Sequence, residues 1–324
     1  MRRRIALLAA MLLVLSALMS GCSMPWGGKD NNNVNNANET EVQEPQVTFT
    51  VSDLKKYADR STSLWEMMGF IFPDCAVYKD AAGKYVIETA KEGLERNKYD
   101  WSDMSKAIRG IDVSKYQGTI DWRKVAFSDV RFAFIRIGYR GYETGKMVMD
   151  ETFRYNIENA LANGIPVGVY FVTKATSAEE GREEAQWIIN NIRAYNVTWP
   201  VVMDFEGAKD ETDRTYGMSA DTRDEVILAF CDTLREAGYT PMLYGSIGTY
   251  MTKMHIEKLE GINRWFAMYF NEPHFPYSMQ IWQATDSGSV DGIKGNVDID
   301  YTMFNFSTGE DTYVPEAEAE APAK

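Results

Sequence analysis

The chain has 324 residues, of which 45% are apolar and 13% aromatic, which is enough for one full-sized domain with attachments. Its formal net charge is −13 and no basic patch stands out, which argues against nucleic acid as a partner. Only two histidines occur, His255 and His274, so a histidine-rich metal site is nearly excluded.

The N-terminus has the pattern of a secretory signal. Three arginines at positions 2–4 precede an apolar stretch, residues 5–19, that is short for a transmembrane helix. The junction Leu18-Met19-Ser20-Gly21-Cys22 resembles a bacterial lipoprotein cleavage site, although Met19 departs from the usual Leu, Val or Ile. We therefore expect a lipoprotein signal peptide over residues 1–21, a lipid on Cys22, and an extracytoplasmic, membrane-anchored lipoprotein at the cell surface or envelope. An ordinary cleaved signal peptide is the alternative.

Polar segments flank the main part of the chain. The asparagine-rich residues 22–46 predict a disordered tether, and residues 307–324 predict an acidic disordered tail. Residues 47–104 are expected to form a small α+β appendage of unknown role, with a hairpin whose strands lie near 76–78 and 85–87. Cys75 and Cys231 could form a disulfide, but Cys231 falls on the apolar stripe of a predicted helix, which favours a buried free thiol.

From residue 105 onward, hydrophobic strands alternate with helices. Strands are predicted at 109–113, 132–139, 166–172, 199–207, 240–244, 265–270, 279–284 and 297–301, and helices at 151–163, 178–193, 221–237 and 250–259. This alternation is typical of a parallel sheet covered by helices, and the last three strands lack room for helical connections. The predicted fold of residues 105–306 is therefore α/β, a TIM-like (β/α)5(β)3 barrel. No glycine-rich phosphate loop follows the first strand, which weakens a nucleotide-binding interpretation.

The fourth predicted strand ends in two acids, Asp204 and Glu206. Alternate residues of a strand point to the same face, so both carboxylates share one face at the strand's C-terminal end. Two like charges so close push their pKa values apart, which gives one proton donor and one anion at the same pH. The alternative is a strand end at which both acids simply meet solvent.

Two further acids are expected at the same end of the barrel. Asp112 ends the first strand and Asp298 lies on the eighth, and closure of the barrel makes these strands neighbours. Aromatic residues occur at matching depths, and aromatic rings suit the apolar faces of sugars; they are Tyr139, Tyr170, Tyr244, Tyr269 and Trp282. Core packing is the alternative for any single ring, but four converging acids predict a functional site.

These residues lie in motifs that resemble glycoside hydrolase family 25, the N-acetylmuramidases also called Chalaropsis-type lysozymes. The resemblance covers roughly residues 106–306 and is carried by GIDVSKYQGTIDW at 110–122, FIR at 134–136, GVYF at 168–171, DFE at 204–206, WFAMY at 265–269, IWQ at 281–283 and VDID at 297–300. Phe171 departs from the pattern, because many members have histidine there.

The resemblance implies a peptidoglycan hydrolase that cleaves the β-1,4 bond between N-acetylmuramic acid and N-acetylglucosamine. Glu206 would be the general acid, Asp204 would assist by orienting the substrate 2-acetamido group, and Asp112 and Asp298 would hold the charge and geometry of the site. The sugar groove would be lined by Arg136, Tyr170, Tyr244, Trp265, Tyr269 and Trp282. No cofactor or metal is implied, and a monomer is expected.

Three other interpretations remain. A chitinase of the related barrel type would need a longer acidic series before Asp204, where Val202 and Trp199 stand instead. A divalent-metal hydrolase could use four carboxylates and would lose activity in a chelator. A non-catalytic cell-wall-binding lipoprotein would not need the four acids to be intact.

Overall fold

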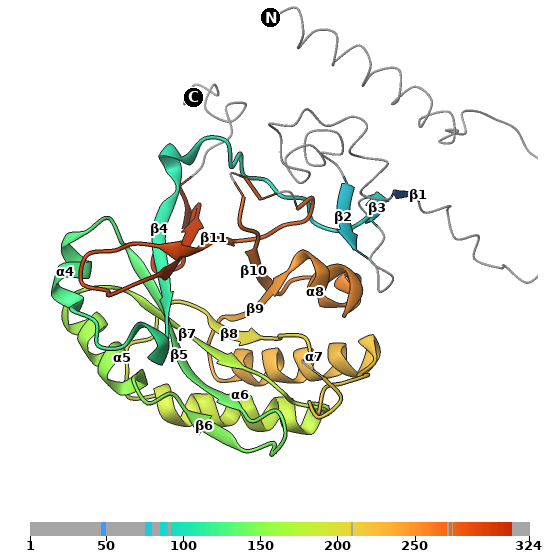
Figure 1. The fold of residues 1–324 in the computed structure, drawn as a ribbon, viewed down its shortest axis with the longest axis horizontal. Coiled ribbons are helices and arrows are strands. Elements are labelled where there is room, and N and C mark those ends of the chain that lie inside the picture. The colour runs from blue at the N-terminus through green and yellow to red at the C-terminus, as the bar shows by residue number, and fades with distance from the viewer. Residues whose placement is uncertain are drawn as a thin grey trace, which may run out of the picture. The chain divides into compact units, whose positions relative to one another are not determined.

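The structure is a computed structural model that describes residues 47–49, 75–79, 85–89, 92–208, 210–270, 272–273 and 275–312 (Figure 1). The predicted signal peptide, the lipid on Cys22, the tether and residues 313–324 of the predicted tail lie outside the described residues. Within the described part of the chain, no helix is long and apolar enough to cross a membrane.

Eight strands close into a barrel, as predicted. They are β4 (Ile108–Val113), β5 (Phe132–Arg140), β7 (Val167–Val172), β8 (Val201–Asp204), β9 (Pro241–Ser246), β10 (Asn263–Ala267), β11 (Ile281–Gly288) and β12 (Val297–Thr302). They pair in that order, and β12 pairs with β4 to close the barrel. The strands from β4 to β11 run parallel, whereas β12 is antiparallel to both of its neighbours.

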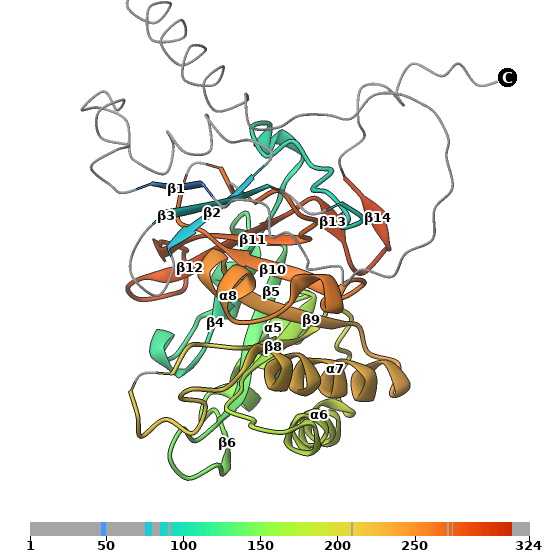
Figure 2. The ribbon, with the colours of Figure 1, turned by 90° about the vertical axis from the view of Figure 1, so that its right-hand side faces the viewer.

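Helical crossovers join the strands from β4 to β10 and lie outside the barrel. They are α4 (Trp122–Phe127), α5 (Phe153–Ala162), α6 (Ala178–Ile192), α7 (Ala220–Glu236) and α8 (Ile247–Thr252). Figure 2 shows α6 and α7 side by side. The helix predicted at 250–259 is instead two pieces, α8 and the 3-10 helix η4 (Ile256–Leu259). No helix separates β10, β11 and β12 among the described residues, so the (β/α)5(β)3 prediction is confirmed.

Local sequence signals set the helix ends. Ser177 and Ser219 cap α6 and α7, because their side chains accept backbone N–H bonds from Glu180 and Thr222. Gly238 follows α7 with φ 83°, a left-handed conformation that glycine adopts without strain. Cys231 lies on the buried face of α7 as a free thiol, which confirms the favoured interpretation, and burial raises its pKa to about 12.

Apolar side chains fill the barrel interior toward the N-terminal ends of the parallel strands. This layer consists of Phe132, Phe134, Trp199, Val202, Met242, Trp265 and Ile281. Phe132 stacks on Trp199 with ring centroids 4.1 Å apart, and Phe134 stacks on Trp265 at 4.6 Å. A Cβ added at Gly110 would come 2.3 Å from the Phe132 ring, so glycine lets this ring reach the wall of the barrel. This layer therefore fills one end of the barrel interior.

The N-terminal hairpin is present as predicted. The strands β2 (Cys75–Lys79) and β3 (Tyr85–Thr89) pair antiparallel, and β1 (Val47–Phe49) adds to β3. Short pieces not foreseen from the sequence include β6 (Met147–Met149), β13 (Phe304–Asn305), β14 (Glu310–Asp311) and the 3-10 helices η2 (Met104–Lys106) and η3 (Lys115–Gln117).

Both predicted boundaries of the barrel need correction. Leu94, Tyr99 and Trp101 are buried in the core that the barrel shares with its helices. The Tyr99 hydroxyl donates to Asp311 Oδ1 at 2.6 Å, and Asp311 lies on β14 within the predicted tail. The packed unit therefore includes residues 92–104 and extends at least to residue 312.

Trp101→Ala should lower the free energy of unfolding by about 3–5 kcal/mol, because it removes a buried indole that packs edge-on against Trp282 at 5.8 Å. Urea unfolding followed by circular dichroism would measure this loss. Phe127→Ala is the control, since its side chain is 83% exposed and its replacement should change stability by less than about 0.5 kcal/mol. Equal effects of the two substitutions would show that the segment does not belong to the barrel's fold.

Candidate active site

Polar side chains line the barrel interior at the C-terminal ends of the parallel strands. The antiparallel strand β12 adds polar side chains at the same end. Each lies on the interior face of its strand, as the alternation of side chains along a strand requires. They are Asp112 on β4, Arg136 on β5, Tyr170 on β7, Asp204 on β8, Tyr244 on β9, Gln283 on β11 and Asp298 and Asp300 on β12. Acids from separate strands therefore gather at one mouth of the barrel.

Asp112 and Asp298 meet where the barrel closes. The two residues are direct partners in the antiparallel pairing of β4 with β12, as the sequence predicts. Burial raises the pKa of Asp298 to about 6, with a smaller contribution from the charge of Asp286. Burial also raises the pKa of Asp112, and the neighbouring charge of Asp298 adds to this shift.

A hydrogen-bonded chain orients Asp112. Gln283 Nε2 donates to Asp112 Oδ2 at 2.7 Å. The other end of the same amide, Oε1, accepts the hydroxyls of Tyr244 at 2.8 Å and Tyr269 at 3.0 Å. Because two hydroxyl groups donate to Oε1, the amide nitrogen must face Asp112, and the carboxyl of Asp112 must act as an acceptor there.

Asp204 and Glu206 lie in different environments. Asp204 is the last residue of β8 and is only 6% exposed, and its Oδ1 has no hydrogen-bond partner among the described residues. Glu206 lies beyond the strand in the following loop and is exposed. Burial, and then the charges of Glu206 and Asp112, raise the pKa of Asp204, while Lys174 opposes the shift.

The burial of Asp204 bears on the roles expected for the two acids. The resemblance assigns the proton to Glu206 and leaves Asp204 ionised. In the structure β8 ends at Asp204, so its carboxyl stays inside the barrel and holds a proton more tightly than an exposed aspartate does.

The loop that carries Glu206 is held by Lys174 and by a backbone hydrogen bond. Lys174 is buried, and its Nζ lies 2.8 Å from Asp213 Oδ2 and 3.3 Å from the carbonyl oxygen of Gly207, to which it donates. The backbone N–H of Thr173 donates to the carbonyl oxygen of Asp204 at 2.9 Å. These bonds restrain the chain on both sides of Glu206, although no sequence pattern pointed to Lys174.

Arg136 is held by a buried carboxylate on one side and covered by an aromatic ring on the other. Its Nε donates to Asp150 Oδ2 at 2.7 Å, and its guanidinium lies 5.0 Å from the ring centroid of Tyr116. Tyr116 is 78% exposed, so its outer face is open to a ligand. Tyr116 lies in the first motif, but the sequence pattern predicted no role for it.

The residues predicted to line a sugar groove differ in their exposure to solvent. Tyr269 is 47% exposed, and Tyr170 and Tyr244 are half-buried in the interior. Trp265 is buried in the apolar layer, and its Nε1 donates to Asp300 Oδ1 at 2.8 Å, so it forms the floor of the site. Burial raises the pKa of Tyr170, and the charge of Asp112 adds to it.

Trp282 does not join the site. It points to the outer face of β11, where its Nε1 donates to the carbonyl oxygen of Met268 at 2.7 Å and its ring packs against Trp101. Gln283, the next residue, takes the interior position because side chains alternate along a strand. Trp282 therefore stabilises the packing of the N-terminal segment and cannot line a sugar groove.

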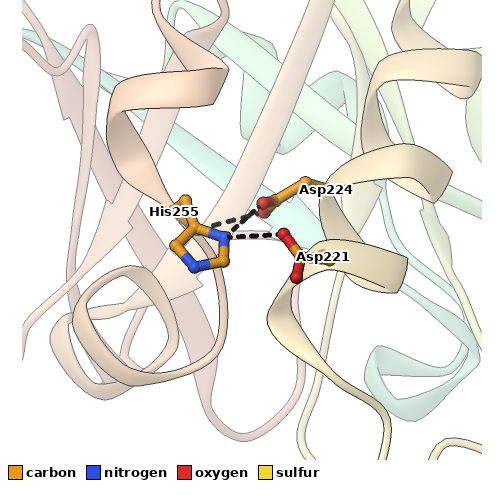
Figure 3. Close-up of side chains that lie close together, drawn as sticks. All are labelled: Asp221, Asp224 and His255. Carbon is orange, nitrogen blue, oxygen red and sulfur yellow. Dashed lines mark hydrogen bonds and ion pairs between the residues drawn. The ribbon is translucent and has the colours of Figure 1, made fainter.

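A second polar cluster lies between α7 and the segment before η4. His255 Nδ1 lies 2.6 Å from Asp224 Oδ2 and 3.8 Å from Asp221 Oδ1 (Figure 3). Three ligand atoms so close could suit a cation, but Lys258 Nζ already lies 2.6 Å from Asp221 Oδ1. The cluster is therefore better explained as a set of ion pairs that joins two segments.

Known proteins resemble this chain over the barrel. The Autolytic lysozyme of Clostridium acetobutylicum is 26% identical over 194 residues, which cover 60% of this chain and 55% of that protein. Lysozyme M1 of Streptomyces globisporus is 27% identical over 221 residues, covering 63% of this chain and 69% of that protein. This chain thus spans about half the length of the Clostridium protein.

Solved structures share the fold. The modular autolysin LytC from Streptococcus pneumoniae, solved in complex with a synthetic peptidoglycan ligand, has a TM-score of 0.54 and 26% identity, covering 70% of this chain and 56% of that chain. A family 25 glycosyl hydrolase from Bacillus anthracis has a TM-score of 0.53 and 21% identity, covering 68% of this chain and 100% of that chain. The model of the glycosyl hydrolases family 25 matches residues 111–293, more than half of the chain, and the protein therefore belongs to this family.

Proposed function

We propose that the protein is a lysozyme-type peptidoglycan hydrolase that cleaves the β-1,4 bond between N-acetylmuramic acid and N-acetylglucosamine. The observation that carries the proposal is the convergence of Asp112, Asp204, Glu206 and Asp298 at one mouth of a family 25 barrel. Relatives that are named lysozymes, and a structural neighbour solved with a peptidoglycan ligand, support this substrate. All four acids come from one chain, so the proposed site needs no residue from a second copy.

Glu206 is the general acid of the proposed reaction. Its exposed position at the end of β8 lets it reach the glycosidic oxygen, which must be protonated as the bond breaks. Asp204 accepts a hydrogen bond from the substrate 2-acetamido N–H at its Oδ1, which has no partner among the described residues. An N–H donor stabilises the anion of Asp204 and so opposes the rise in its pKa that burial causes.

The acetamido group then acts within the substrate. Its carbonyl oxygen is oriented toward the anomeric carbon by the bond to Asp204, and ionised Asp204 also balances the positive charge that develops on the sugar. Asp112 and Asp298, which pair between β4 and β12, add negative charge to the site and hold its geometry. Arg136, Tyr170, Tyr244 and Tyr269 contact the sugars, and the exposed ring of Tyr116 adds a platform beside Arg136.

Digestion of purified peptidoglycan tests this proposal. Products are reduced with borohydride and analysed by mass spectrometry, and the new reducing end is expected on N-acetylmuramic acid. A new reducing end on N-acetylglucosamine would contradict the assigned bond. Loss of activity in EDTA, restored by a divalent cation, would instead support a metal-dependent hydrolase. Binding to the wall without any release of fragments would support a non-catalytic cell-wall-binding lipoprotein.

We further propose that the protein is anchored to the membrane through a lipid on Cys22, outside the cytoplasm. Support comes from the sequence, in which Ser20-Gly21-Cys22 follows an apolar stretch and precedes a polar tether. This location suits a substrate in the cell wall.

Cys22→Ala should release the protein from membranes or block its processing, because the lipid is attached through the cysteine sulfur. Membrane fractionation and the mass of the mature protein measure the outcome. Cys75→Ala is the matched control, since it removes a thiol outside the predicted signal peptide and should leave fractionation unchanged. A Cys22→Ala protein that stays membrane-bound at the normal mature mass would rule out the anchor.

A further inference from the structure

Asp300 is a carboxyl that the proposed reaction does not use. It lies on β12 two residues after Asp298, on the same interior face, and none of its surface is exposed. Its neighbours in the pairings of β12 are Gln283 on β11 and Gly110 on β4. Because Gly110 has no side chain, nothing on β4 separates Asp300 from Asp112, which follows two residues later.

The two oxygens of Asp300 have different surroundings. Oδ1 accepts the indole N–H of Trp265 at 2.8 Å. Oδ2 is buried and receives no bond from an N–H or hydroxyl group of the described residues. The register of β12 against β4 places the carboxyl of Asp112 next to it on the same interior face, across the side-chain-free Gly110. Two carboxylates can form a hydrogen bond with each other only when one of them carries a proton.

The remaining contacts show which carboxyl carries this proton. Asp112 already accepts a bond from Gln283 and lies near the positive charge of Arg136, and both interactions favour its anion. Asp300 has the single indole donor, and the charges of Asp112 and Asp298 disfavour its anion. Although burial raises the pKa of both carboxyls, these contacts favour the proton on Asp300 over Asp112.

We propose that Asp300 is a positioning residue: a neutral carboxylic acid that donates its O–H to Asp112 and so keeps Asp112 ionised and fixed at the mouth of the barrel. The role of Asp112 in catalysis rests on the proposed function. The protonation of Asp300 does not, because it follows from the contacts alone.

The proposal predicts a loss of order at high pH. Among the described residues, the titratable groups that face Asp300 are Asp112 from β4, Asp298 from β12 and Tyr244 from β9, while β10 and β11 contribute the neutral Trp265 and Gln283. Burial first, and then the charge of Asp112, raise the pKa of Asp300 well above its usual value. Ionisation at alkaline pH would place a second charge against Asp112 and break their bond.

Asp300→Asn tests this role because an amide can reproduce both contacts. Its carbonyl oxygen accepts the Trp265 N–H, and its NH2 group donates to Asp112. We expect kcat within about tenfold of wild type, since one neutral donor replaces another. The variant has no proton to lose at this position, so its bond to Asp112 should persist at alkaline pH.

Asp300→Ala should lower kcat about 100-fold with little change in KM, because Asp112 loses a donor but no substrate contact is removed. Asp291→Asn, the same chemical change at an exposed aspartate, is the control and should leave the pH profile unaltered. If Asp300→Asn loses as much activity as Asp300→Ala, Asp300 is not a proton donor to Asp112.

Two readouts do not depend on activity. The infrared difference spectrum of wild type minus Asp300→Asn should contain the carbonyl band of a protonated carboxylic acid at neutral pH. The folded protein retains a proton that the unfolded chain releases above about pH 4, so wild-type stability falls as pH rises. Asp300→Asn should therefore gain in urea midpoint relative to wild type between about pH 4 and pH 8.

These readouts separate the two proposals. An enzyme that fails to digest peptidoglycan but shows the carboxylic acid band disproves the proposed function and leaves the protonation of Asp300 intact. A carboxylate band for Asp300 at neutral pH, or a urea midpoint difference that does not grow with pH, overturns the inference whatever the activity.

Discussion

Glu206→Gln should lower kcat on peptidoglycan by about 10²–10⁴-fold while binding to the wall is largely retained. Glutamine keeps the shape and hydrogen-bonding capacity of the side chain but has no proton to give to the leaving oxygen. Glu206 is exposed at the end of β8, so the substitution leaves the buried part of the barrel untouched and should not change stability.

Turnover on soluble wall fragments and sedimentation with insoluble peptidoglycan together measure this effect. Glu211→Gln is the matched control, because it makes the same change at another exposed glutamate of the same loop. It should retain wild-type turnover. If Glu206→Gln digests peptidoglycan within about tenfold of wild type, the assignment of the general acid is wrong.

The barrel could be predicted from sequence because its strands and helices differ in pattern. Short hydrophobic runs such as 166–172 alternate with helices whose caps, such as Ser219, are local signals. The number of strands and the missing helices after β10 then fix the order of the barrel. Closure alone brings Asp112 beside Asp298, although the two residues are 186 positions apart in the sequence, from 112 to 298.

The direction of individual side chains could not be predicted in the same way. On β11 both faces are buried, because one lines the barrel interior and the other packs against further core residues. Hydrophobicity therefore cannot tell whether Trp282 or Gln283 points inward. The polar Gln283 was the available signal, since an amide on a buried strand needs hydrogen-bond partners, and these exist only around Asp112.

The contacts of Asp300 could not be predicted from the sequence for a related reason. Its motif contains two acids in alternate positions, and only their register against β4 shows that Asp298 faces Asp112 while Asp300 lies deeper, opposite Gly110. The burial of the segment with Leu94 and Trp101 could not be predicted either, because it depends on contacts with residues far along the chain, such as Tyr277 and Asp311. It has no periodic pattern that would mark it as part of a helix or strand.

Asp204→Asn should lower kcat by about 10²–10³-fold, the usual loss when a transition-state electrostatic contact is removed. The variant keeps the size of the side chain but loses the negative charge that balances the developing positive charge on the sugar. Its amide can still accept one hydrogen bond at Oδ1, so KM should change less than kcat. Asp232→Asn, at an exposed position on α7, is the control for the loss of one charge.

The same variant should shift the basic limb of the pH profile to lower pH. In wild type, burial first and then the charge of Glu206 raise the pKa of Asp204, so its carboxyl keeps a proton to higher pH than an ordinary aspartate does. The Asp204→Asn variant lacks this carboxyl, so we expect the site to lose its catalytic proton at a lower pH and activity to fall earlier as pH rises. Profiles of kcat between about pH 4 and pH 9 would reveal the shift, because this range spans the usual and raised pKa values of carboxyl groups. A basic limb that stays in place or moves to higher pH would show that Asp204 does not control the catalytic proton.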